Sequence, residues 1–124
     1  MKKVIHSNNA PKAIGPYSQA IEANNMIFIS GQIPMNPEIG QVPEGIEAQT
    51  EQVMKNIGAI LTEAGLDFSN IVKTTCLISD MDNFQAMNAV YATRFPENPP
   101  ARAAYGVCRL PLGVLIEIES IAVR

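Results

Sequence analysis

Hydrophobic and polar positions alternate over two short stretches in the first third of the chain. Residues 17–23 and 26–33 are rich in β-branched and aromatic side chains, which favour strands. Asn24 and Asn25 separate the two stretches, and asparagine tolerates the left-handed backbone of a tight turn. The pattern predicts a β-hairpin, preceded by a further short strand at 3–6.

The spacing of hydrophobic residues changes after this hairpin. Pro34 to Gly45 is rich in proline and glycine and predicts a surface loop. From Ile46 to Ala64 apolar residues recur at helical spacing, and Gly65 is typical of the residue that follows a helix. The residues predicted to face solvent on this helix are Glu47, Gln49, Glu51, Gln52 and Lys55.

The middle of the chain predicts a strand and a second helix. Residues 71–79 are rich in β-branched side chains, and the helix before them is long enough to cross over between parallel strands, so a βαβ unit is expected. The second helix starts with Asp80 or Asp82 as its cap and ends before Pro96. Its predicted buried side consists of Phe84, Met87, Val90, Tyr91 and Phe95.

Two closing strands complete an α+β fold. They cover about 101–109 and 114–123, and a turn at 110–113 joins them. We expect a single domain over residues 1–124, with a mixed six-stranded sheet and two helices on one face. The last strand is apolar on both sides, so the second sheet face needs a protein partner. A second copy of the chain is the simplest such partner.

The last strand also carries two candidate chemical groups. Alternation places Glu117 and Glu119 on one face, where they interrupt an apolar stripe of Leu115, Ile121 and Val123. A partly buried carboxylate either finds a cation or hydrogen-bond donors or has a raised pKa, and a raised pKa is how a general base or acid near neutral pH can be made. The alternative is that both glutamates lie on a solvated face.

Arg102 is a candidate anion-binding residue. It follows two prolines, and its neighbours Ala101 and Ala103 are too small to shield it. The planar guanidinium binds a carboxylate through two hydrogen bonds, so a small carboxylate ligand suits this position. The alternative is a structural salt bridge across adjacent strands to Glu117 or Glu119.

Composition and charge narrow the chemistry. The 124 residues include nine Lys and Arg against twelve Asp and Glu, a net charge of -3 without a basic run, which disfavours nucleic acid as a partner. No apolar stretch indicates a signal peptide or a membrane span, so we expect a cytoplasmic protein. His6 is the only histidine, and no nucleotide or metal motif occurs, so neither a metal nor a nucleotide cofactor is expected. Cys76 and Cys108 lie in apolar runs and predict buried free thiols.

Four motifs resemble the RidA/YjgF family, also called the L-PSP endoribonuclease family. They are GPYSQA at 15–20, ISGQIP at 29–34, PPAR at 99–102 and RLPLGVLIEIESIAV at 109–123. The resemblance extends over essentially the whole chain. It implies a chorismate-mutase-like fold, a homotrimer with sites between the subunits, and no cofactor.

The resemblance also implies a function and a set of site residues. The active subgroup hydrolyses reactive 2-enamino and 2-imino acids, such as 2-iminobutanoate and 2-iminopropanoate, to 2-oxo acids and ammonia. By this resemblance, Arg102 binds the substrate carboxylate and Glu117 activates water. The other implied site residues are Tyr17, Ser30, Gly31 and Ala104, where the glycine and alanine contribute main-chain groups.

The chain departs from the family pattern in one place, and two other functions found among relatives stay open. Many relatives read Ser-Cys after the arginine, whereas this chain reads Ala103-Ala104, so a thiol beside Arg102 is missing. One alternative is a non-catalytic trimer that binds or senses small carboxylates. The other is an endoribonuclease or translation inhibitor, which the net charge disfavours.

Overall fold

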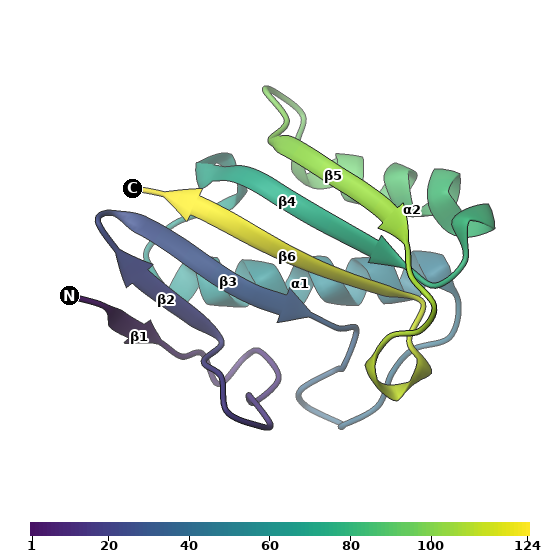
Figure 1. Cartoon of the computed structure of the whole chain (residues 1–124), viewed down its shortest axis with the longest axis horizontal. Coiled ribbons are helices and arrows are strands. Elements are labelled where there is room, and N and C mark those ends of the chain that lie inside the picture. The colour runs from purple at the N-terminus through teal and green to yellow at the C-terminus, as the bar shows by residue number, and fades with distance from the viewer.

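The computed structural model describes all 124 residues as one mixed sheet with two helices packed on the same face (Figure 1). The strand order is β1-β2-β3-β6-β4-β5. This arrangement confirms the predicted α+β class, the six strands and the two helices. The strands are β1 Lys3–Ile5, β2 Ala20–Ala23, β3 Met26–Gln32, β4 Ile71–Ile78, β5 Ala101–Gly106 and β6 Ile116–Val123, and the helices are α1 Ile46–Glu63 and α2 Phe84–Tyr91.

The hairpin of β2 and β3 forms where the sequence predicts it. Asn24 and Asn25 both adopt the left-handed backbone, with φ of 52° and 62°, and Ala23 pairs with Met26 on either side of them. Strand β2 is shorter than predicted, because it begins at Ala20 rather than residue 17. The residues before it form a loop.

The parallel strands are arranged differently from a simple βαβ unit. Helix α1 does connect two parallel strands, β3 and β4, but β6 lies between them and pairs antiparallel with both. The adjacent parallel strands are β4 and β5, which α2 connects. The last strand of the chain is therefore central, and β5 forms one edge of the sheet (Figure 1).

The core lies between the sheet and α1. Val53, Ile57 and Leu61 of α1 are fully buried in it. Gln49, which the sequence pattern placed on the solvent-facing side of this helix, is buried instead. That prediction was wrong because the Gln49 amide binds main-chain groups of two other segments. It donates to the Pro43 carbonyl at 3.0 Å and accepts from the Leu115 amide at 2.8 Å.

The two cysteines differ in environment. Cys76 on β4 is fully buried and Cys108 is exposed, and both are free thiols. The prediction of a buried Cys108 was wrong because β5 ends at Gly106, so the apolar run around Cys108 leaves the sheet.

Two further buried amides fix the loops at one end of the sheet. Asn56 of α1 donates to the carbonyls of Ile33 and Met35, at 3.0 and 2.9 Å, and so holds the segment after β3. Gln19 holds the N-terminal loop, accepting from the Ser7 amide at 2.7 Å and donating to the Pro11 carbonyl at 2.8 Å. These bonds supply partners to buried main-chain groups that no strand or helix pairs.

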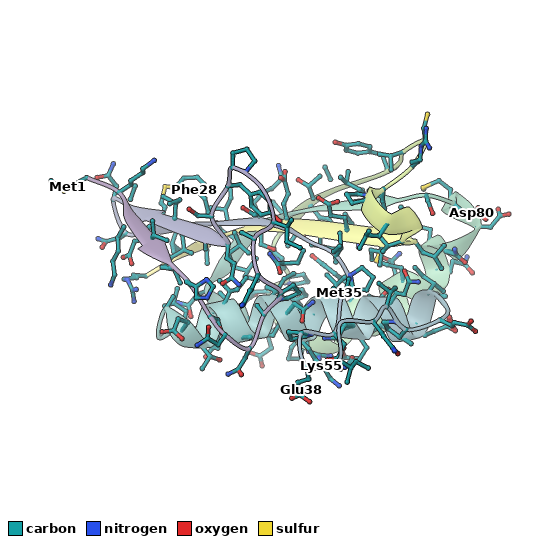
Figure 2. The ribbon with its side chains drawn as sticks, turned by 90° about the horizontal axis from the view of Figure 1, so that it is seen from below. Met1, Phe28, Met35, Glu38, Lys55 and Asp80 are labelled. Carbon is teal, nitrogen blue, oxygen red and sulfur yellow. The ribbon has the colours of Figure 1, made fainter.

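The sheet face opposite the helices has no cover within the chain. Figure 2 shows both helices on one side of the sheet and Phe28 on the other. Phe28 is 43% exposed although it is a large apolar residue in the middle of a strand. Neither helix is long and apolar enough to cross a membrane. An uncovered face with a large exposed apolar residue fits the expectation of a protein partner.

The Gln19 clamp predicts a large loss of stability on truncation. Gln19→Ala leaves the Ser7 amide and the Pro11 carbonyl without their partner in a buried place, so we expect a free energy of unfolding lower by about 2–4 kcal/mol. Urea unfolding at fixed protein concentration measures it. Gln41→Ala is the matched control, since the Gln41 side chain is exposed. Equal stability of the two variants would contradict the clamp.

Candidate active site

Glu117 points away from the helices. Its neighbours Ile116 and Ile118 are fully buried in the core, so alternation along β6 places Glu117 on the open face of the sheet. There its carboxylate lies against Gly31 of β3. A Cβ atom at position 31 would overlap the Glu117 carboxylate, so glycine is needed here for the close approach and not for an unusual backbone angle.

The surroundings of Glu117 disfavour its charge. Burial raises the pKa of the Glu117 carboxyl above its usual range, and the nearby Glu119 carboxylate raises it further. The two glutamates line a cavity of about 410 Å³ together with Tyr17, Ser30, Gly31, Ile33 and Pro111. The solvated-face alternative therefore holds for the exposed Glu119 and only in part for Glu117, which is half-buried on the same face.

Tyr17 and Ser30 reach this cavity from the N-terminal loop and from β3. The Tyr17 hydroxyl accepts a hydrogen bond from the Ile14 amide at 3.4 Å, and 52% of the residue is exposed. The Ser30 hydroxyl donates to the Ser18 carbonyl at 2.6 Å. Since its proton is used inside the chain, the Ser30 oxygen is left as an acceptor toward the cavity.

Arg102 lies on the other face of the sheet. It pairs in register with Thr74, whose buried side chain bonds the Tyr91 hydroxyl of α2 at 2.7 Å. The Arg102 guanidinium donates to the Asn88 side-chain oxygen at 2.6 Å, and its central carbon lies 5.0 Å from the centre of the Tyr91 ring and 5.5 Å from that of Phe84. One hydrogen bond and two aromatic rings therefore orient the guanidinium.

The predicted alternative for Arg102, a salt bridge to Glu117 or Glu119, is wrong. Strand β4 lies between β5 and β6, so the arginine and the glutamates are not on adjacent strands. Arg102 instead lines a cavity of about 320 Å³ with residues of α2 and the proline-rich segment: Asn88, Tyr91, Ala92, Phe95, Pro99 and Pro100.

Asn88 is a site residue that the sequence analysis missed. Phe84, Asn88 and Tyr91 recur at helical spacing on the side of α2 that faces Arg102. The hydrophobic pattern assigned the two aromatic residues to the core and left the asparagine unexplained. A polar residue between two aromatic ones on the same side of a helix was the available signal.

Ala104 lies on the same sheet face as Arg102, in register with Cys76 of β4. Burial raises the pKa of the Cys76 thiol to about 11, so this thiol is neutral. The chain thus has a buried thiol on the strand beside Ala104, in place of a thiol at position 104 itself.

Comparison with known proteins decides the family. The family profile described as Endoribonuclease L-PSP matches residues 7–124. The chain belongs to this RidA/YjgF family. A RutC family protein of Pyrococcus horikoshii is 54% identical over 125 residues, covering 100% of this chain and 99% of the relative. The 2-iminobutanoate/2-iminopropanoate deaminase of Mus musculus is 50% identical, covering 100% of this chain and 93% of that protein.

A solved structure of the same family has the same fold. The structure of E. coli TdcF with bound serine matches with a TM-score of 0.94 at 40% identity, and the match covers 98% of each chain.

The predicted site of this RidA/YjgF chain falls into two halves. The carboxylate half-site, on the open face, brings together Tyr17, Ser30, Gly31 and Glu117. The guanidinium half-site, on the helix face, contains Arg102 with Asn88, and Ala104 lies beside it on β5. The sheet separates the two half-sites, so one chain does not bring Arg102 and Glu117 together.

The raised pKa of Glu117 predicts a pH-dependent stability. The folded state holds this proton more tightly than the unfolded chain, so ionisation of Glu117 lowers stability as pH rises from the ordinary toward the raised pKa. We expect Glu117→Gln to melt at a higher temperature than the unmodified protein at neutral pH. The difference should vanish below about pH 4. Thermal melts across pH measure it, with the exposed Glu44→Gln as control. A lower melting temperature for Glu117→Gln at neutral pH would contradict the prediction.

Proposed function

We propose that this chain is a 2-iminobutanoate/2-iminopropanoate deaminase, which hydrolyses reactive 2-imino acids and their 2-enamino tautomers to 2-oxo acids and ammonia. The observation that carries the proposal is the full-length similarity, at 50% identity, to a protein of that name, in a chain with an oriented guanidinium and a partly buried carboxylate. These are the two groups that hydrolysis of an imino acid requires.

The two half-sites complete each other between copies of the chain. One substrate contacts both Arg102 and Glu117 only if they come from two subunits, because they lie on opposite faces of one sheet. The uncovered face, which carries Phe28 and the carboxylate half-site, supplies a surface for such an assembly. The assembly we propose is a homotrimer with three equivalent sites between subunits.

The reaction is an addition of water to a carbon–nitrogen double bond. Arg102 binds the substrate carboxylate through the planar fork of its guanidinium, which Asn88 and two aromatic rings hold in place. Glu117 accepts a proton from water as the water oxygen bonds to the iminium carbon, and returns a proton to the nitrogen. The hydroxyl group of this adduct then gives its proton to Glu117 as its oxygen forms the double bond to carbon. Ammonia leaves with the electron pair of the carbon–nitrogen bond, which gives the 2-oxo acid. No covalent intermediate with the protein is needed.

The remaining groups of the carboxylate half-site hold the substrate or the water. The Tyr17 hydroxyl and the Ser30 oxygen face the same cavity as Glu117. In the proposed assembly, main-chain groups at Gly31, and at Ala104 of the guanidinium half-site, bind the imino nitrogen and the developing hydroxyl group. The serine bound to E. coli TdcF is a small molecule with a carboxylate and a nitrogen on one carbon, which is consistent with a substrate of this class.

The proposed activity predicts a loss on removal of Arg102. Threonine dehydratase generates 2-iminobutanoate from threonine, and the release of 2-oxobutanoate is then followed with and without this protein. We expect the unmodified protein to accelerate this release. Arg102→Ala should accelerate it about a hundredfold less, because the substrate carboxylate loses its bidentate partner.

Arg109→Ala is the matched control for this assay, since Arg109 is exposed and is outside both half-sites. If a folded Arg102→Ala protein showed normal turnover, Arg102 would not be the residue that binds the substrate carboxylate. A folded unmodified protein without any acceleration favours a trimer that binds carboxylates without catalysis.

A subunit-mixing experiment tests the division of the site. Arg102→Ala and Glu117→Gln are each expected to be inactive. When equal amounts are unfolded and refolded together, random assembly in a closed ring gives about a quarter of the sites an intact arginine and an intact glutamate from different chains. We expect about a quarter of the unmodified activity. No recovery, from mixtures that light scattering shows to have assembled, would mean that both groups act within one chain.

A further inference from the structure

A second cavity adjoins the one that contains Glu117. It measures about 240 Å³ and lies among three segments that gather at one end of the sheet: the N-terminal loop, the segment after β3 and the turn before β6 (Figure 1). We call it the apolar recess. It shares Tyr17, Gly31, Ile33 and Pro111 with the first cavity, and its other lining residues are Pro11, Lys12, Ile14, Gln19, Gln32, Met35 and Leu112.

The polar side chains that line the recess are already hydrogen-bonded within the chain or hydrated at the surface. The two glutamine side chains in it are buried and use their amides within the chain, Gln19 on the N-terminal loop and Gln32 on the Ser30 carbonyl at 3.1 Å. Lys12 is exposed, so its ammonium group is hydrated at the surface. The groups left to meet a ligand are mainly hydrocarbon.

The rim of the recess exposes large apolar side chains. Ile14 on one side is 88% exposed and Leu112 on the other is 71% exposed. Leu112 also has φ of 59°, a left-handed backbone that leucine rarely adopts. Exposed apolar side chains on both sides of a cavity mark a place where an apolar group is covered.

We propose that the apolar recess receives the aliphatic side chain of the 2-imino acid, and that Leu112 determines how well longer chains are accepted. The inference rests on the proposed function. The reacting carbon of the substrate carries a carboxylate, which Arg102 binds, a nitrogen, and an alkyl group. The recess is the apolar space that adjoins the Glu117 cavity, so it is the place for the alkyl group.

The size and the rigidity of the recess agree with this occupant. A volume of about 240 Å³ is below the 300–1,000 Å³, roughly, of pockets that enclose whole ligands, and it suits one side chain. Gln19 holds the Pro11 carbonyl, and Asn56 holds those of Ile33 and Met35. The recess is therefore formed before substrate binds, which favours discrimination between chain lengths.

The test compares imino acids of different chain length. An L-amino-acid oxidase with catalase generates them from alanine, leucine and methionine, and kcat/KM is measured for the unmodified protein, Leu112→Gly and Leu112→Asn. Both replacements suit the left-handed backbone at this position, so folding is retained. We expect kcat/KM for the leucine and methionine products to fall about three- to tenfold, because apolar contact is lost, and that for the alanine product to stay unchanged.

Ile39→Asn is the matched control, since Ile39 is 63% exposed and lies outside the recess. Equal changes for all three substrates, or no change for any, overturn the inference and leave the proposed function standing. A Leu112 variant with an altered oligomeric mass overturns it too, since the rim is then a subunit contact. An unmodified protein inactive on all three substrates overturns the proposed function and this inference with it.

Discussion

Three buried side-chain amides hold the irregular parts of this fold to its regular part. Gln19, Gln49 and Asn56 each bind main-chain groups of segments that have no strand or helix partner. Such segments lose hydrogen bonds to water when they fold against a core, so without the amides the buried groups would be unpaired. The walls of the Glu117 cavity and of the apolar recess depend on these segments.

The carboxylate half-site also depends on the packing of a neighbouring segment. Glu117 is partly buried because β3 passes directly beside it, and that approach is possible because residue 31 has no side chain. The burial that follows makes ionisation of Glu117 more difficult. On the other face, the orientation of Arg102 comes from α2 through Asn88 and Tyr91. The carboxylate half-site is therefore supported by a neighbouring strand of the sheet, and the guanidinium half-site by the helix that packs on its face.

Local sequence patterns predicted the helices and strands well, but not which of them lie side by side. Alternation identified the last strand and the face of Glu117, and the asparagine pair identified the hairpin turn, because both signals lie within a few residues. The order of strands in the sheet depends on long-range packing, so the sequence did not reveal that β4 separates Arg102 from the glutamates. The buried Gln49 was misassigned for a related reason. Its partners, Pro43 and Leu115, belong to other segments, and a helical pattern scores only the polarity of the residue itself.

The opposite placement of Arg102 and Glu117 makes the proposed chemistry depend on the amount of protein. Chains that have not associated have only incomplete sites, so the number of working sites rises more steeply than the number of chains at low expression. Dilution in a test tube would have the same effect. In the proposed assembly, the sheet that separates the two groups thus makes catalytic output depend on the concentration of the chain.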